Sequence, residues 1–348
     1  MKKKITIAID AMGGENAPKK NIEGLNIFLK KNKLNNDFII HLHGDEKILN
    51  KELSNKNISS KFVKVIHSAS VVSDEETPLT AIKNSKNTSM WNSIQSQTSG
   101  EADISLSAGN TGVLFVISKM ILKMMNEVTR PALAGLWPSN KGMSVVLDLG
   151  ANVECDEKNL IDFSEMGAAL YKSIFPDQKP YVSLLNIGSE EIKGTELLKK
   201  TYSKLKSLSN EKNFIFNGYI EGNELMNGDT NVIVTDGFTG NIALKTAEGT
   251  AKFVVDKLKK SLTENIFSKL SMIFSYFSLK KFKSELDPRK YNGAIFLGLN
   301  GPVVKSHGST DSIGFYYSID LCYRIIKGNL MHQIKDNLNH LNVRDKKE

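Results

Sequence analysis

The sequence alternates short apolar segments with longer amphipathic ones, and this alternation limits the folds open to the chain. Ile5–Ile9, Phe38–Leu42, Ser144–Leu147 and Tyr181–Leu185 have the length and composition of buried strands. Each is followed by a segment with helical spacing. Strands that alternate with helices predict a mostly parallel sheet covered on both faces. We therefore expect a Rossmann-like three-layer α/β/α sandwich that forms one domain over residues 1–348.

Polar clusters rich in glycine follow five of the predicted strands. They are Asp10–Gly14, Ser107–Gly112, Asp148–Asn152, Asn186–Gly194 and Asp236–Asn241. Ligands of open α/β sheets bind beyond the carboxyl ends of the strands, so the clusters predict a site on one shared edge. Helices are expected over Thr80–Gln97, over Asp311–Leu341 and over Val113–Met125, the last directly after the second cluster. The N-terminal N–H groups and the dipole of the Val113–Met125 helix favour an anion there.

The amino-acid composition of the chain limits the kinds of binding partner that we expect. The chain has 348 residues and a formal net charge of +8. This charge favours phosphate, an acidic carrier protein, anionic lipid or nucleic acid as a partner. Cys155 and Cys322 form neither a disulfide framework nor a zinc set, which suits the cytoplasm. The six histidines are scattered without metal-ligand spacing, so no metal is expected.

Several common catalytic motifs do not occur in this sequence. It contains no Gly-x-Gly-x-x-Gly after the first strand, no Walker-type phosphate loop and no Gly-x-Ser-x-Gly elbow. These observations disfavour nicotinamide chemistry, nucleotide hydrolysis and a serine nucleophile, and no cofactor is expected. An acyl intermediate on Cys155 is conceivable, but a small buried residue is the better interpretation because no base is near in sequence. For His307, lining the site and a structural role are equally supported.

Residues 252–285 form a second distinctive region. They carry eight lysines against three acidic residues, and Phe267, Phe274 and Phe277 contribute to an apolar face. A basic amphipathic helix or helical hairpin of this kind suits a membrane interface. Core packing or a dimer interface explains the same pattern, and the residues alone leave both alternatives open.

Taken together, the motifs resemble the bacterial acyl-acyl carrier protein:phosphate acyltransferase family, PlsX, over roughly residues 4–335. The resemblance rests on Asp10–Gly14, Ser107–Gly112, Arg130–Ala132, Asp148–Asn152, Leu185–Gly188 with Lys193–Gly194, Asp236–Asn241 and Lys305–Gly308. Two departures are Glu15-Asn16, where the family usually has Asp-His, and Ile192, where a lysine is common.

The resemblance implies a fold similar to the isopropylmalate dehydrogenase and phosphotransacetylase group, a homodimer and no cofactor. It implies transfer of a long-chain acyl group from acyl carrier protein to inorganic phosphate, at the start of phospholipid synthesis. It also implies a peripheral position at the inner face of the cell membrane, held by residues 252–285. The downstream glycerol-3-phosphate acyltransferase is a further candidate partner.

Roles for single residues are hypotheses at this stage. Phosphate binding is assigned to Ser107–Gly112, including Ser107, Gly109, Asn110, Thr111 and Gly112, with the help of Lys193. Asn241 or neighbouring amides would stabilise the oxyanion, and His307 would donate a proton or a hydrogen bond. The other candidate substrate-binding residues are Asp10, Gly13, Gly14, Arg130, Asp148, Asn152, Asn186, Asp236 and Gly240, of which Asp148, Asn152 and Asn186 are expected to organise the site.

Two other functions were weighed. A phosphotransacetylase that uses coenzyme A and a small acyl group is the alternative enzyme. A nucleic-acid-binding protein is suggested only by the charge, and the sequence has no recognisable binding module.

Overall fold

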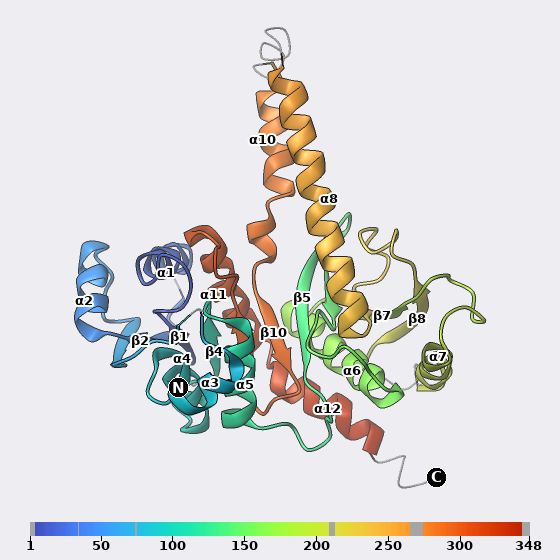
Figure 1. The fold of residues 1–348 in the computed structure, drawn as a ribbon, viewed down its shortest axis with the longest axis horizontal. Helices are drawn as coiled ribbons and strands as arrows, with labels where there is room; N and C mark the ends of the chain where they lie inside the picture. The colour runs from blue at the N-terminus through green and yellow to red at the C-terminus, as the bar shows by residue number, and fades with distance from the viewer. Residues whose placement is uncertain (1–3, 34, 74, 209–212, 265–273, 343–348) are drawn as a thin grey trace.

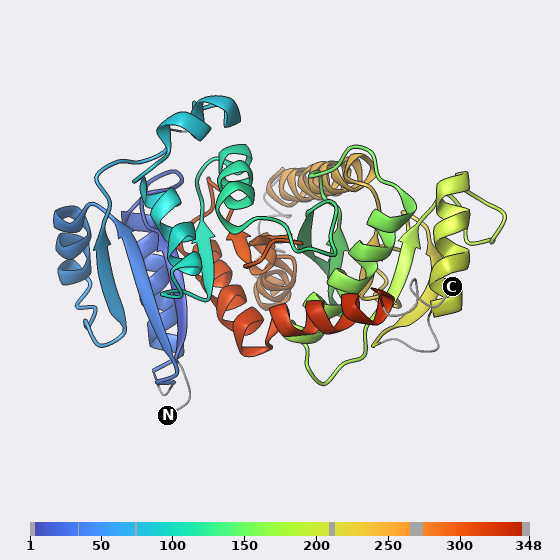
Figure 2. The ribbon, with the colours of Figure 1, turned by 90° about the horizontal axis from the view of Figure 1, so that it is seen from below.

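The computed structural model of this chain describes residues 4–33, 35–73, 75–208, 213–264 and 274–342. Its centre is one 11-stranded sheet in this described part, ordered β3-β2-β1-β4-β11-β10-β5-β6-β9-β7-β8 (Figures 1 and 2). The strands are β1 Ile5–Asp10, β2 Phe38–Gly44, β3 Val63–His67, β4 Ile104–Ser107, β5 Ala132–Ser139, β6 Gly142–Leu147, β7 Tyr181–Leu185, β8 Ile215–Ile220, β9 Val232–Val234, β10 Ala294–Leu297 and β11 Val303–Lys305.

The sheet consists of two parallel groups that run in opposite directions. Strands β3, β2, β1, β4 and β11 are mutually parallel, as are β6, β9, β7 and β8. Between the groups, β10 and β5 are joined through three antiparallel pairings, β11–β10, β10–β5 and β5–β6. The carboxyl ends of β1 and β4 therefore lie at the opposite sheet edge from those of β6, β9 and β7. The expected row of five loops on one edge is wrong, and the loops form two separate clusters.

Helices cover both faces of the sheet, as the alternation predicted. They are α1 Lys19–Lys31, α2 Glu46–Asn55, α3 Pro78–Asn84, α4 Ser89–Thr98, α5 Thr111–Leu122, α6 Glu157–Ile174, α7 Glu196–Leu208, α8 Gly237–Thr263, α10 Tyr276–Glu285, α11 Ser312–Lys327 and α12 Leu330–Asn342, with a 3-10 turn at Pro288–Tyr291. On one face α1, α11, α6 and α12 pack in a connected series. On the other, α4 and α5 cover one end and the base of α8 covers β6.

The strands alternate their side chains between these two layers. In β6, Val145 and Leu147 join the large core beneath α1, α11 and α6, whereas Val146 joins a smaller core with the base of α8. In β11, Val304 and Val303 divide in the same way between the large core and the α4–α5 core. Because both faces are covered, the strands are apolar throughout, which explains why their sequence shows runs and not alternation.

Three local expectations were corrected by the structure. The helix expected over residues 80–97 is two helices, because the Thr88 side chain caps a new start by accepting from Trp91 N. The helix expected over residues 311–341 is interrupted at Asn329, whose φ is +56°. Strand β5 was missed, because Gly135 and Pro138 give Ala132–Ser139 little strand character.

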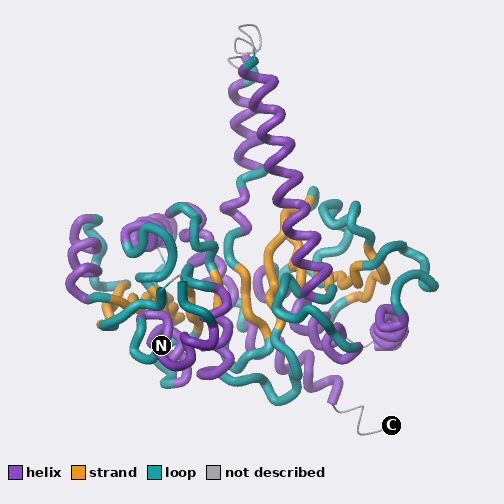
Figure 3. Tube along the Cα trace, viewed as in Figure 1, coloured by secondary structure: helices purple, strands orange, loops and turns teal. Residues whose placement is uncertain are grey.

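Helices α8 and α10 project from the sheet as a long hairpin (Figures 1 and 3). Their large side chains are exposed, including Phe253 (61%), Phe274 (85%) and Phe277 (82%). Phe267 lies outside the described residues. None of the described helices has the length and hydrophobicity that crossing a lipid bilayer requires. The hairpin is thus a distinct projection, and only the first turn of α8 reaches a loop cluster.

A buried histidine predicts how folding stability depends on pH. Burial lowers the pKa of His43, at the end of β2, from its ordinary 6.5 to about 4. The unfolded chain therefore binds more protons between these values, and stability that is complete above pH 6.5 is lost as the pH falls toward 4. We expect about 3 kcal/mol of unfolding free energy to be lost between pH 7 and pH 4 through this residue.

Urea unfolding at several pH values measures this loss. His43→Leu should flatten the pH dependence, because leucine carries no group that titrates. The substitution breaks no side-chain hydrogen bond among the described residues, since neither ring nitrogen of His43 has a partner there. The control is His67→Gln at the exposed end of β3, which should keep the wild-type slope. Equal slopes for wild type and His43→Leu would contradict the assignment.

Candidate active site

The first loop cluster gathers three chain segments at the carboxyl ends of β1, β4 and β11. These segments are Asp10–Gly14, Ser107–Gly112 and Lys305–Gly308. Asp10 Oδ2 accepts a hydrogen bond of 2.7 Å from Ser107 Oγ, which in turn accepts one of 3.0 Å from Gly109 N. Burial raises the pKa of Asp10, and the hydrogen bond from Ser107 opposes that rise. Asp10 is only 1% exposed, and its carboxylate holds the two loops together.

Two glycines let the segments of this cluster approach closely. A methyl group at Gly13 would lie 2.8 Å from Gly109 N and 2.5 Å from Asp10 Oδ2. Gly14 has a φ of +87°, and a methyl group there would lie 2.9 Å from Ala108 Cβ. Both positions therefore exclude larger residues, and their role is to bring backbones together.

Helix α5 begins within the first cluster. Asn110 caps it: its Oδ1 accepts from Val113 N at 3.2 Å, and its Nδ2 donates to Glu76 O at 3.2 Å. Thr111 is exposed and Gly112 is half-buried, so the first turn of the helix reaches the surface. The positive end of the α5 dipole is consequently open to an anion.

Two buried lysines near this turn were missed in the sequence analysis. Lys305 Nζ donates to Ala108 O at 3.4 Å and also to Ser306 O. Lys20 Nζ donates to Gly308 O at 2.7 Å. Both side chains are less than 10% exposed and bring positive charge beneath the loops. The available signal was a lysine that ends the apolar strand Val303–Lys305.

His307 lies at the rim of the first cluster. Its side chain is exposed, and its Nδ1 lies 3.0 Å from Ser309 Oγ and accepts from Ser309 N at 3.3 Å. Its backbone N donates to Asn292 Oδ1 at 3.0 Å. The histidine is therefore near the predicted site, with one ring nitrogen turned toward its own loop.

The second loop cluster lies at the ends of β6, β9 and β7, beside the start of β5. Its segments are Arg130–Leu133, Asp148–Asn152, Asn186–Gly194 and Asp236–Asn241. At its centre Asp148, fully buried, accepts five hydrogen bonds. They come from Leu133 N (2.9 Å), Gly150 N (3.3 Å), Ala151 N (3.1 Å), Asn152 N (2.7 Å) and Asn152 Nδ2 (2.8 Å). Burial raises the pKa of Asp148, and these hydrogen bonds lower it.

Asn152 links this loop to two neighbours. Its Nδ2 also donates to Pro131 O at 2.7 Å, and its carbonyl oxygen accepts from Gly237 N at 2.7 Å. Helix α8 comes so close that a methyl group at Gly240 would lie 2.0 Å from Asp148 O. Asp236 caps this helix by accepting from Thr239 N at 2.8 Å. The Asp236–Asn241 segment is thus the first turn of α8, held against the Asp148 loop.

The remaining candidates surround this core. A methyl group at Gly150 would lie 2.8 Å from Asn241 Nδ2, so the exposed Asn241 amide sits over that glycine. Arg130 is exposed, and its Nη1 donates to Glu154 O. Asn186 Nδ2 donates to Gly188 O and to Lys193 O, both at 3.2 Å, and so closes the loop that carries the exposed Lys193 side chain.

The predicted phosphate ligands are divided between the two clusters. Ser107–Gly112 belongs to the first, and Lys193 to the second; in sheet order, five strands separate β4 from β7. No contact between these ligands occurs among the hydrogen bonds of the described residues. The structure brings Asp148, Asn152 and Asn241 together, with Arg130 and Asn186 on neighbouring segments.

The Cys155 thiol lies close to this second cluster. Burial, together with the charges of Asp148 and Asp236, raises its pKa to about 12. The thiol is therefore protonated at neutral pH, and a thiolate is the form that attacks acyl groups. This supports the interpretation that Cys155 is a packing residue.

In the described part of the chain, no three His, Cys, Asp or Glu residues are grouped so that they could hold a metal ion.

Comparison with known proteins identifies the family of this chain. The family described as fatty acid synthesis proteins matches residues 5–333. The phosphate acyltransferase of Pelagibacter ubique is 56% identical over 338 residues, which cover 97% of this chain and 100% of that protein. The phosphate acyltransferase of Parvibaculum lavamentivorans is 42% identical over 98% of this chain and 93% of its own.

The chain belongs to the phosphate acyltransferase family. The two relatives named above are acyltransferases, and the matching family consists of lipid synthesis enzymes. Among solved structures, the EutD phosphotransacetylase from Staphylococcus aureus aligns with a TM-score of 0.61 and 15% identity over 93% of this chain and 94% of that one. A phosphotransacetylase from Streptococcus pyogenes gives 0.60 and 14% over 95% of each. At these identities the likeness shows the fold, as the sequence motifs predicted.

Two glycines in α8 test the close contact at the second cluster. Gly240→Ala should force α8 away from the Asp148 loop, costing about 2–4 kcal/mol of unfolding free energy and most of the acyltransferase activity. Gly249→Ala is the matched control on the same helix, because nothing lies within 4 Å of the added methyl group.

The control should be stabilised by about 0.5–1 kcal/mol, since alanine loses less conformational entropy in a helix than glycine does. Thermal unfolding and activity measured on both variants give the comparison. Equal behaviour of the two alanine variants would contradict the proposed contact between α8 and the Asp148 loop.

Proposed function

We propose that the protein transfers a long-chain acyl group from acyl carrier protein to inorganic phosphate and releases an acyl phosphate. A phosphate oxygen attacks the thioester carbonyl, a tetrahedral oxyanion forms, and the carbon–sulfur bond breaks. The sulfur leaves as the thiolate of the carrier protein and takes up a proton from solvent. Phosphate is itself an anionic nucleophile, so no nucleophile from the protein is required.

The open first turn of α5 is the observation that carries this proposal. Asp10 and Ser107 hold the preceding loop, Asn110 caps the helix, and the ammonium groups of Lys20 and Lys305 lie beneath. Such a turn suits a small dianion. The buried Asp10 carboxylate faces Ser107 and not the surface, which limits its repulsion of phosphate.

The second cluster suits the thioester carbonyl. Since this cluster and the α5 turn lie at opposite sheet edges, direct attack requires the carbonyl and the phosphate to be brought within bonding reach of each other in the reacting complex. The Asp148 carboxylate accepts hydrogen bonds from three backbone N–H groups of its own loop, and these bonds fix the conformation of the loop. The Asn241 amide lies above Gly150 and is exposed, so it is available to a developing oxyanion. Preorganised donors of this kind stabilise an oxyanion without reorganising during the reaction.

The assay of this proposal measures acyl phosphate by mass spectrometry. Acyl phosphate should form only when both the acyl carrier protein thioester and phosphate are present. Turnover of acetyl-coenzyme A at a higher kcat/KM would instead support the alternative phosphotransacetylase.

In the same assay, Lys193→Ala should raise the KM for phosphate about tenfold. The variant loses one charged hydrogen bond to phosphate, and such a bond contributes about 1.5 kcal/mol or more.

Lys51→Ala is the matched control for charge. Lys51 is exposed on α2, which packs on β3 at the far end of the sheet from the second loop cluster. Its removal should leave both kcat and the KM for phosphate unchanged. An unchanged KM in Lys193→Ala as well would remove Lys193 from phosphate binding and leave that role to the first cluster.

We further propose that the α8–α10 hairpin attaches a homodimer to the inner face of the cell membrane. Its exposed Phe274 and Phe277 would enter the lipid interface, and lysines such as Lys280, Lys281 and Lys283 would face anionic headgroups. The rest of its apolar surface would pack against the second copy. An acyl phosphate released there would reach the downstream glycerol-3-phosphate acyltransferase through the membrane.

Flotation with vesicles containing anionic lipid tests the attachment. Phe277→Ser should weaken binding roughly tenfold, because burying one phenylalanine contributes about 1.5–3 kcal/mol. The control is Leu79→Ser in α3, which removes a side chain of similar exposure (78% against 82%) away from the hairpin. Equal flotation of Phe277→Ser and wild type would contradict insertion of the hairpin.

A further inference from the structure

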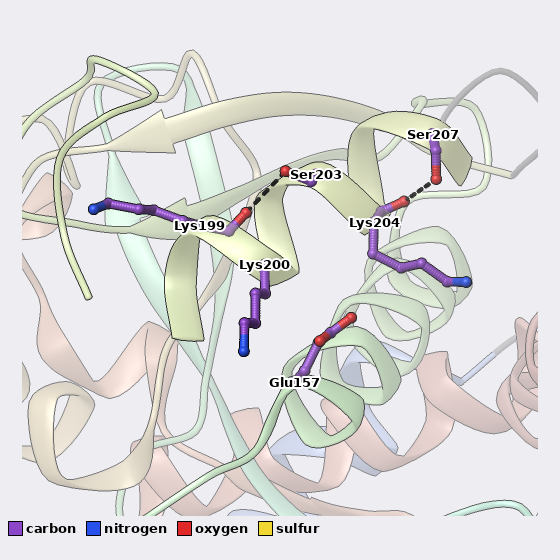
Figure 4. Close-up of a pocket in the computed structure, with 6 residues that line it drawn as sticks. All are labelled: Glu157, Lys199, Lys200, Ser203, Lys204 and Ser207. Atoms are coloured by element: carbon purple, nitrogen blue, oxygen red, sulfur yellow. Dashed lines mark hydrogen bonds between the residues drawn. The ribbon is translucent and has the colours of Figure 1, made fainter. Parts of the chain in front are cut away.

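A shallow groove of about 490 Å³ lies between α7 and the first turn of α6 (Figure 4). We call it the lysine groove. Its lining residues are Glu157, Lys199, Lys200, Ser203, Lys204 and Ser207. Lys199 is paired with Glu196, so Lys200 and Lys204 against Glu157 leave the groove a net positive charge. The groove is open to solvent along its length, which suits the side of a helix better than an enclosed small molecule.

Lys200 and Lys204 are the groups in this groove that remain available to a partner. Ser203 Oγ donates to Lys199 O and Ser207 Oγ to Lys204 O, so both hydroxyl groups are turned back to α7. Lys199 pairs with Glu196 at 3.0 Å. Lys200 and Lys204 form no ion pair among the described residues, and Figure 4 shows them extending on either side of Glu157.

The position of the groove ties it to the second loop cluster. Helix α6 begins at Glu157, shortly after the Asp148–Asn152 segment, and α7 begins at Glu196, directly after the Asn186–Gly194 segment. The two helices pack against each other. A partner seated in the groove would therefore lie beside the loops to which we assign the thioester.

We propose that the lysine groove is the docking surface for an acidic helix of the acyl carrier protein. This inference rests on the proposed function. A substrate carried on a flexible arm needs its protein held next to the site and not inside it. Exposed lysines meet this need because they steer an acidic partner and fix its orientation without deep burial. Charge complementarity and the place of the groove beside the second loop cluster favour this occupant.

The test reverses charge in the groove with the double variant Lys200→Glu/Lys204→Glu. Kd for fluorescently labelled acyl carrier protein and KM for its acyl thioester should both rise about tenfold, because exposed ion pairs contribute up to ~1 kcal/mol each. KM for phosphate should not change. The salt dependence of acyl carrier protein binding should also become weaker than in wild type.

Lys47→Glu/Lys51→Glu is the matched control. It makes the same change in net charge on α2, near the opposite end of the sheet, where both lysines are exposed. It should leave Kd and KM at the wild-type values. Equal weakening by both double variants would show a response to net charge alone and would overturn the docking surface.

The remaining outcomes also decide the question. Unchanged Kd in the groove variant overturns the docking surface while leaving the proposed function intact. A groove variant that changes sedimentation, or that loses vesicle flotation, assigns the groove to a second copy of the chain or to lipid, and overturns it too. Failure of wild type to form acyl phosphate from acyl carrier protein would instead contradict the proposed function.

Discussion

The buried carboxylate of Asp148 is the interaction on which the second loop cluster depends. Its hydrogen bonds join the end of β6 to the start of β5 and to the loop before α6. A carboxylate in a protein interior is stable only when donors surround it, so the loop and the carboxylate require each other. The close approach of α8 at Gly240 adds a third element to this assembly. Asp10 repeats the same arrangement at the end of β1 through Ser107.

This arrangement explains how acidic residues fit a site for an anionic substrate. Asp10 and Asp148 are both almost completely buried, and their oxygens face donors within their own loops. In the proposed reaction they would organise the loops without presenting negative charge to phosphate. The protonated Cys155 thiol leaves the incoming phosphate as the nucleophile in the proposed reaction. Catalysis would then consist of binding, alignment and stabilisation of the oxyanion.

Most of the elements of this fold could be predicted from the sequence, but their directions could not. Apolar runs such as Ile5–Ile9 identified the buried strands, and the polar clusters after them identified the loops. The reversal between the two halves depends on β5 and β10. Their pairing is a long-range contact, and β5 contains Gly135 and Pro138, which obscure it. This is why one shared edge was expected and two clusters were found.

For the site, prediction succeeded where a residue type has a local function. Asn110 and Asp236 lie at helix starts and cap them, as their side chains favour. Lys305 and Lys20 were missed because their importance comes from the segments that meet around them: Ala108 and Gly308 are far away in sequence. The lysine groove was missed for the same reason, since α6 and α7 are brought together only by packing.

The claim that phosphate attacks the thioester directly is tested by intact-protein mass spectrometry, after phosphate labelled with heavy oxygen has shown that a phosphate oxygen forms the new bond to carbon. We predict that the acyl phosphate retains all of the label, with one labelled oxygen bridging carbon and phosphorus. Intact-protein mass spectrometry with acyl carrier protein thioester and no phosphate should show no acylated enzyme. An acyl group on the enzyme that phosphate then removes would contradict direct attack and would require a nucleophile in the protein.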